Sequence, residues 1–278
     1  MNDTTYMRNV EIALRTQPDI LIASDCAVKK IKKEIEREKE FQKKLPTNTE
    51  LAIKTYELLK EHSTNIRLYI VFQGYTTRHM EIFFKSISSI CFDGVSMPIR
   101  NQSLGQTALF LVQLWKMGIK NIHLLGVAAL FPMALAAFFA RHFFEFVIMD
   151  ASSWKDGAMG NVYFNPHNLS SVHVGEDVII DLTIAMDCQC SACKGRSFSY
   201  YQNLPYTYRR ILLCAHNFRA TENMGQELLK HSTTVNTLID FLRTKTDRVG
   251  EIEELYDVLV LVESLKNEDI RYLEEILT

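Results

Sequence analysis

Short runs of apolar residues recur six times along the chain, and longer segments separate them. Each run is almost continuously apolar, which is typical of parallel strands that are buried on both faces of a sheet. Most of the segments between the runs place apolar residues at helical spacing. We therefore predict an α/β protein with a parallel sheet, and the predicted strands are Asp19–Ala23, Arg67–Gln73, Phe92–Ser96, Asn121–Gly126, Phe146–Asp150 and Arg210–His216.

The same periodicity predicts the helices, and Pro46 and Thr49 mark the start of one of them. Two segments break the alternation. Gly157–Asp187 is polar with alternating Val and Ile and predicts a small inserted β element, whereas the tail from Thr221 is helical and acidic. The predicted helices are Ala27–Lys44, Thr49–His62, Thr77–Ser88, Gln106–Met117 and Met133–His142.

With 278 residues, the chain is long enough for one (β/α)8 barrel of about 250 residues. Only 18 residues precede the first strand run, and six runs stand where a closed barrel needs eight strands. We predict a TIM-type (β/α)8 barrel that is complete or lacks its first units. The barrel domain comprises residues 1–220, with an inserted subdomain at about 157–216, and a helical segment follows at 221–278.

Composition excludes several classes of protein. Hydrophobic residues make up 47% and charged residues 23% of the chain, which excludes a disordered or collagen-like protein. The formal charge is −2, so a nucleic acid would have to be held by a local basic patch. The first residues lack the apolar core of a signal peptide, and Gly126 and Pro132 interrupt the apolar run Leu124–Ala140. We expect a cytoplasmic protein without a membrane partner.

Three of the six cysteines fall within six residues, at Cys188, Cys190 and Cys193. Together with His216 they offer three thiolates and one imidazole, a full tetrahedral set for structural zinc. Such clustering in a chain without an export signal favours a metal over disulfides. Cys214 lies two residues before His216 in a predicted strand, where both would point to one face, so Cys214 is an alternative fourth ligand. The other interpretation is three buried thiols and a core histidine.

The segment CQCSAC, followed by ILLCAHNFR, resembles the zinc motif and the His-Asn pair of the tRNA-guanine transglycosylase superfamily. Three upstream segments occur in the same order as in that family. DILIASDC resembles its strand that ends in a base-recognising Asp, LYIVFQG its Val-Gln-Gly strand, and FVIMD the strand that ends in its nucleophilic Asp. The resemblance implies a (β/α) barrel with a zinc subdomain. It also implies a pentosyltransferase that exchanges guanine for a 7-deazaguanine base, as in queuosine formation, in tRNA or, in one branch, in DNA.

The resemblance assigns roles to five residues. Asp150 would attack the anomeric carbon, expel the base and hold a covalent sugar ester until a second base reverses the step. Asp25 would accept the paired donors on a guanine edge, Gln73 and the backbone of Gly74 would meet the carbonyl side, and Gly126 would also bind substrate. From the residues alone, Asp150 is more simply a turn cap, Asp25 an N-cap and Gln73 a polar strand end.

Basic and aromatic residues interleave around the cysteines and could hold phosphates and stack on exposed bases. A solvated loop surface explains these charges almost as well. A predicted helix carries a second candidate patch, Lys29, Lys30, Lys32 and Lys33, but the alternation with Glu34, Glu36 and Glu38 is more typical of an ordinary solvated face. The predicted nucleic-acid contacts are Lys194, Arg196, Arg209 and Arg210.

Three departures from the family are visible in the sequence. The Asp-Ser-Gly-Gly segment that supplies the family's general acid/base has no counterpart, Pro98-Ile99 replaces a Gly-Gly pair, and ASSWK follows Asp150 in place of Pro-Thr-Arg. The general acid/base is therefore unassigned. The alternatives are a non-catalytic zinc-containing subunit that binds nucleic acid or a partner chain, and a zinc-stabilised scaffold. We expect the chain to form a homodimer or to assemble with a partner subunit.

Overall fold

The computed structural model describes residues 4–29, 31–100, 102–126, 129–175, 186 and 188–265. These residues form two compact units. One unit holds the described residues up to Leu125, Phe143–Ile148 and residues 264–265, and the other holds those of Gly126–His142 and Met149–Glu263.

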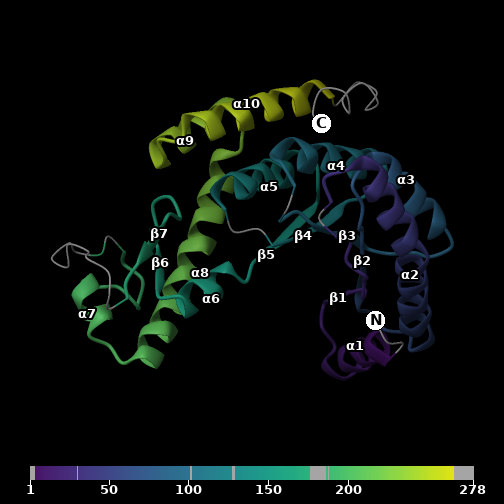
Figure 1. Cartoon of the computed structure of the whole chain (residues 1–278), viewed down its shortest axis with the longest axis horizontal. Helices are drawn as coiled ribbons and strands as arrows, with labels where there is room; N and C mark the ends of the chain where they lie inside the picture. Colours follow the sequence, from purple (N-terminus) through teal and green to yellow (C-terminus); the bar gives the residue numbers. More distant parts are fainter. Residues whose placement is uncertain are drawn as a thin grey trace. The chain divides into compact units, whose positions relative to one another are not determined.

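Five strands form one sheet in the order in which they occur in the chain (Figure 1). The paired strands whose register is defined run parallel, with Tyr69 opposite Gly94 and Ser96 opposite His123. The α/β class and the parallel sheet are therefore confirmed. The sheet curls like half of a barrel, and within the described part of the chain its first and last strands each pair on one side only. The strands are β1 (Ile20–Ile22), β2 (Arg67–Val71), β3 (Gly94–Pro98), β4 (Asn121–Leu125) and β5 (Phe146–Asp150).

Helices connect these strands, and short polar side chains begin two of them. Thr76 accepts a hydrogen bond from the backbone N–H of His79, and Ser103 accepts one from that of Gln106, as expected of N-cap residues. The alternation of strand and helix brings the carboxyl ends of the parallel strands to one edge of the sheet. The helices up to β5 are α1 (Thr4–Thr16), α2 (Glu34–Glu61), α3 (Thr77–Ser86), α4 (Leu104–Lys116) and α5 (Leu130–His142).

The structure corrects two details of the first predicted helices. The predicted break at Pro46 is absent, because α2 continues through this proline as one helix. The chain from Ala27 to Lys33 was predicted to be helical, but its described residues form a loop. The helix α1 was not predicted. Among the described residues, no helix is long and apolar enough to cross a membrane.

The second unit contains a two-stranded antiparallel sheet and a series of helices. Its two strands confirm a small β element within the predicted insert, of which residues 176–185 and 187 lie outside the described part. Besides α5, the elements are α6 (Ser153–Met159), β6 (Val162–Phe164), β7 (Ser171–His173), α7 (Phe198–Gln202), α8 (Tyr206–His231), α9 (Val235–Lys245) and α10 (Val249–Ser264), of which only Ser264 belongs to the first unit.

The strand predicted at Arg210–His216 is wrong, because this segment lies in the middle of α8. A short apolar run without caps does not distinguish a buried strand from a buried helix. The buried side chains of α8 recur at helical spacing, and the predicted domain boundary at residue 220 falls inside this helix. These buried residues are Arg209, Leu213, His216, Asn217, Ala220, Met224 and Leu228.

Candidate functional site

Four side chains of the second unit converge as a candidate metal centre. The ligand atoms of Cys188, Cys190, Cys193 and His216 all lie within 4.8 Å of one another. The Nδ1 atom of His216 lies 3.5 Å from Sγ of Cys188, 3.6 Å from Sγ of Cys190 and 3.1 Å from Sγ of Cys193. In a tetrahedral zinc site, Zn–S and Zn–N bonds of about 2.3 and 2.0 Å place the sulfur and nitrogen ligands about 3.5 Å apart. The four residues therefore have the spacing of a Cys3His metal site.

The imidazole of His216 is oriented by the groups around it. Its Nε2 atom lies 2.7 Å from the carbonyl oxygen of Phe164, which can only accept a hydrogen bond, so Nε2 carries the proton. The lone pair of Nδ1 is then directed toward the three sulfur atoms, as a metal ligand requires. Tyr163 stacks on the ring at 4.0 Å with an interplanar angle of 6°. Burial lowers the pKa of His216 and so favours the neutral, ligating form.

A tight loop places the cysteine side chains. The carbonyl oxygen of Cys190 accepts hydrogen bonds from the backbone N–H groups of Cys193 and Lys194, at 3.0 and 2.9 Å. Gly195 follows with a φ of +73°, a left-handed conformation that glycine adopts without strain. The hydroxyl of Tyr201 donates to the carbonyl of Ala192 at 2.7 Å and closes the loop from the other side.

Burial raises the pKa of the thiols of Cys188 and Cys193. A metal cation would offset this cost, because it binds the deprotonated thiolate. Four protein ligands leave no open position in a tetrahedral site, so the cluster can stabilise the fold but cannot activate a water molecule.

Cys214 is not part of this cluster, so the prediction of Cys214 as an alternative fourth ligand is wrong. The alternative assumed a strand, in which residues two apart point to the same face. Because Cys214 and His216 lie in α8, their side chains are separated by about 200° around the helix axis.

In the first unit, Asp25 and Gln73 form a pair beyond the carboxyl ends of β1 and β2. The side-chain amide of Gln73 donates to Oδ2 of Asp25 at 2.6 Å, and its Oε1 accepts from the backbone N–H of Val28 at 3.3 Å. Gln73 is 6% exposed. Burial raises the pKa of Asp25, against the smaller effect of the hydrogen bond from Gln73. The structure thus joins two residues that are 48 positions apart in the sequence.

Gly74 follows this pair in a confined position. A Cβ atom at Gly74 would lie 2.4 Å from Cζ of Phe72 and 3.0 Å from Cβ of His79. Any larger residue would displace a buried aromatic ring. Packing alone therefore requires glycine here.

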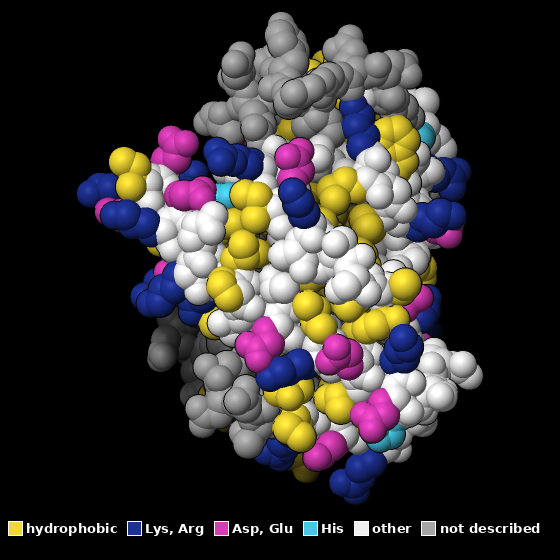
Figure 2. Space-filling view, turned by 90° about the vertical axis from the view of Figure 1, so that its right-hand side faces the viewer, with side chains coloured by type: hydrophobic (Ala, Val, Ile, Leu, Met, Phe, Trp, Pro, Cys, Tyr) yellow, Lys and Arg dark blue, Asp and Glu magenta, His cyan; other side chains and the backbone are white. Residues whose placement is uncertain are grey.

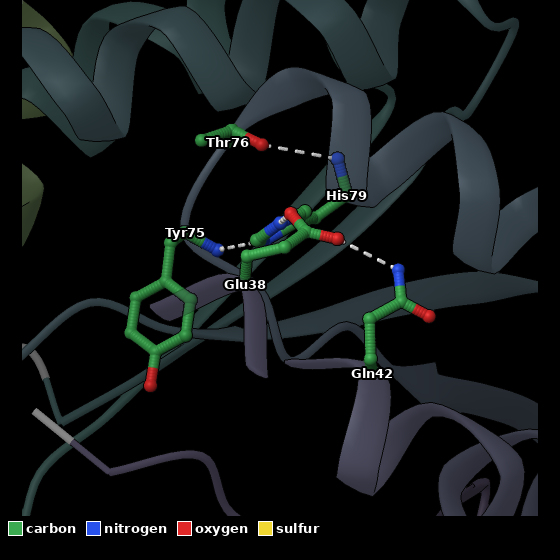
Figure 3. A network of polar contacts seen from close by, with 5 residues as sticks. All are labelled: Glu38, Gln42, Tyr75, Thr76 and His79. Atoms are coloured by element: carbon green, nitrogen blue, oxygen red, sulfur yellow. Dashed lines mark hydrogen bonds and ion pairs between the residues drawn. The ribbon is translucent and has the colours of Figure 1, made fainter. Parts of the chain in front are cut away.

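A polar network holds the loop after Gly74 (Figure 3). The Nδ1 atom of His79 accepts a hydrogen bond from the backbone N–H of Tyr75 at 3.2 Å, so the proton lies on Nε2, which is 2.8 Å from Glu38. Gln42 donates to the other oxygen of Glu38 at 2.8 Å. The hydrogen bond from His79, and then that from Gln42, lower the pKa of Glu38. This network was not predicted, because Glu38 and His79 lie 41 positions apart in the sequence and no motif connects them.

Asn48 was also missed, although it fixes the residue next to Asp25. It is 5% exposed and lies in α2. Its Oδ1 accepts from the backbone N–H of Cys26 at 2.6 Å, and its Nδ2 donates to the carbonyl of Cys26 at 3.2 Å. Lys44 reaches Sγ of Cys26 at 3.0 Å. Asn48 falls between the two helices predicted at Ala27–Lys44 and Thr49–His62, so no sequence signal marked this contact.

In the second unit, Asp150 and Gly126 contact each other. Asp150 is exposed at the end of β5, and its Oδ1 accepts a hydrogen bond from the backbone N–H of Gly126 at 2.8 Å. Gly126 has a φ of +84°. The structure therefore brings the predicted nucleophile, Asp150, and the predicted substrate contact, Gly126, together, and Asp150 is exposed to solvent.

The four predicted nucleic-acid contacts differ in exposure. Lys194 is exposed, Arg196 lies 4.8 Å from the ring centroid of Tyr200, and Arg210 lies 3.4 Å from that of Tyr206. Arg196 and Arg210 are half-buried basic groups beside aromatic rings, whereas Lys194 is simply exposed.

Arg209, in contrast, is buried. It is 2% exposed, and its guanidinium donates to the carbonyl oxygens of Tyr201, Gln202 and Leu204 at 2.9, 2.8 and 3.1 Å. These bonds satisfy carbonyls at the end of α7. The predicted phosphate contact of Arg209 is corrected to a structural role in the turn between α7 and α8.

The chain matches no known protein-family model, and no curated protein matches it.

Proposed function

We propose that the protein exchanges guanine for a 7-deazaguanine base in tRNA or DNA. The observation that carries the proposal is the pair formed by Asp25 and Gln73, which sets a carboxylate and an amide side by side at the strand ends. A guanine edge carries two adjacent N–H donors next to a carbonyl acceptor, and this pair offers complementary groups. Adenine lacks that pattern.

Base entry would exchange one set of hydrogen bonds for another. The amide of Gln73, which now donates to Asp25, would turn its donor to the carbonyl of guanine, and the oxygens of Asp25 would accept from the base. Since Asp25 is half-buried, its interaction with a bound base would be stronger than in water. A base in a duplex or a folded loop has to leave its stack to reach such a group.

Asp150 would act as the nucleophile. One carboxylate oxygen forms a bond to the anomeric carbon, the glycosidic bond to guanine breaks, and the sugar is held as an ester. The incoming base then attacks the same carbon and releases the carboxylate, so the configuration is retained and no oxidant or reductant is needed. The exposure of Asp150 at the end of β5 supports access for a polynucleotide. The group that protonates the leaving guanine is unassigned.

The Cys3His residues fit zinc by ligand type and spacing. We propose a structural zinc ion held by Cys188, Cys190, Cys193 and His216. The proposal includes a reducing, cytoplasmic compartment, in which such thiols stay available for a metal. It also includes a (β/α)8 barrel that further strands, from a second copy or a partner subunit, would complete.

The test is incorporation of labelled guanine or a labelled 7-deazaguanine into tRNA and duplex DNA, run in parallel. We expect exchange in one polymer and none in free nucleosides, because binding energy from the polymer is needed to extrude the base. Asp25→Asn should weaken guanine recognition, since an acceptor becomes a donor that faces a donor. If the parent binds one polymer tightly and exchanges no base in either, the protein is a non-catalytic binding subunit instead.

A further inference from the structure

The loop that links β1 to α2 carries a concentrated positive charge. Residues 26–33 include four lysines, and no acidic residue occurs between Asp25 and Glu34. Lys29, Lys32 and Lys33 are exposed, and the side chain of Lys33 is 80% exposed; Lys30 lies outside the described residues. This loop, residues 26–33, is called the lysine loop below.

The backbone of the lysine loop is held at several points. Asn48 binds both the N–H and the carbonyl of Cys26, and Gln73 accepts from the N–H of Val28. The hydroxyl of Tyr75 donates to the carbonyl of Lys29, and Nε of Arg37 donates to that of Ile31 at 2.7 Å. The exposed side chains of Lys29, Lys32 and Lys33 therefore extend from a loop whose backbone is hydrogen-bonded at Cys26, Val28, Lys29 and Ile31.

These contacts also place the loop beside the proposed base-binding pair. Gln73 binds Asp25 through its amide nitrogen and Val28 through its amide oxygen. Tyr75, two residues after Gln73, binds Lys29. The first lysine, Lys29, thus lies four residues after Asp25 in the sequence, and its neighbour Val28 is hydrogen-bonded directly to Gln73.

The face of the molecule drawn in Figure 2 carries mixed charge. Lys and Arg side chains lie among Asp and Glu side chains on the face drawn in Figure 2, and the formal charge of the chain is −2. Glu36 contacts Lys33 at 3.5 Å and is the ion-pair partner of that lysine. A polyanion would therefore be attracted by a local set of lysines and not by the protein as a whole.

We propose that the lysine loop binds the phosphate backbone of the polynucleotide on either side of the base held by Asp25 and Gln73. The inference rests on the proposed function for the identity of that base. Ammonium groups on a fixed loop neutralise phosphates without reading sequence and position the strand for the groups that do. A nucleic acid fits better than an anionic membrane, because the lysines adjoin groups that recognise a base edge.

The test compares two triple variants. In the first, Lys29, Lys32 and Lys33 are changed to Gln; in the control, the exposed Lys39, Lys60 and Lys85 of the same unit are changed to Gln. Binding to fluorescently labelled tRNA and duplex DNA is measured by anisotropy at several salt concentrations. We expect the loop variant to lose about tenfold or more in affinity at low salt, and its salt-dependence slope to fall by about 2, since each lost phosphate contact removes about 0.7–0.9. The control should stay within about twofold of the parent.

The inference is overturned if both triple variants bind alike, if the parent binds neither polymer, or if the loop variant loses only its binding to vesicles that contain anionic lipid. Thermal unfolding of both variants shows whether either has lost its fold. Base exchange is scored separately. If the loop variant alone loses binding while the parent exchanges no base, phosphate binding by the lysine loop is supported and the proposed base-exchange activity is rejected. If the parent exchanges bases and the loop variant binds normally, only the phosphate-binding role of the lysine loop is rejected.

Discussion

Single side chains decide whether the second unit can hold a metal. His216 presents Nδ1 to the three thiols because Nε2 is bonded to Phe164, and the stack on Tyr163 fixes the plane of its ring. Residue types and spacing were sufficient to predict this set of four ligands. They were not sufficient to reject Cys214, because the choice depends on whether the segment is a strand or a helix.

The first prediction concerns the thiol ligands. Cys190→Ser should abolish stoichiometric metal binding and lower the free energy of unfolding by several kcal/mol, because metal binding contributes directly to folding. Cys214→Ser is the matched control: it lies two residues from His216, is outside the cluster, and should keep the metal. Elemental analysis and thermal unfolding with and without a chelator measure both effects. A parent protein that is folded and free of stoichiometric metal would contradict the metal assignment.

The second prediction concerns Asp25. Its pKa is raised above the usual 3.8 in the folded chain, so the folded state binds the proton more tightly than the unfolded state. The ionised side chain therefore costs stability at neutral pH, and the cost disappears as the pH falls below the usual pKa. Asp25→Asn keeps an acceptor for Gln73 and removes this cost.

Denaturant unfolding should accordingly show a higher free energy of unfolding for Asp25→Asn than for the parent at pH 7, with the difference vanishing below about pH 4. A difference that is constant with pH would mean that burial does not perturb this carboxyl group.

At the scale of elements, the sequence pattern located β1 to β5 because each strand is a short apolar run between helices. It failed at α8, where the run Arg210–His216 has strand-like composition but helical burial. It also divided α2 at Pro46, although the proline is accommodated within a continuous helix. The loop 27–33 could not be separated from that helix, since lysine is a good helix former and the hydrogen bonds that fix the loop come from distant residues.

The third prediction tests the packing between β2 and α3. Gly74→Ala would place a methyl group 2.4 Å from Cζ of Phe72, so it should lower the free energy of unfolding by about 1–3 kcal/mol. Gly250→Ala is a suitable control, because a Cβ at Gly250 meets no atom within 4 Å and the residue lies in α10. Chemical denaturation of both variants gives the comparison. Equal stability of the Gly74→Ala variant and the parent would show that Phe72 can move at little cost.

At the scale of the whole molecule, the chain divides into two compact units, and the candidate groups are distributed over both. Asp25, Gln73 and the lysine loop belong to the first unit, whereas Asp150 and the Cys3His cluster belong to the second. Strand periodicity predicted the parallel sheet but not this division, because the division depends on which helices pack together and not on local pattern.

Covalent trapping tests whether Asp150 is the nucleophile of a base exchange. The parent protein, incubated with tRNA or with duplex DNA and then denatured, should migrate as a covalent protein–nucleic acid complex, because Asp150 holds the sugar as an ester after the base departs. Free guanine should resolve the complex. Asp150→Asn should form none while retaining nucleic-acid binding, since an amide is a poor nucleophile. An equal amount of complex with Asp150→Asn, or no complex with either polymer under conditions where base exchange occurs, would contradict the account.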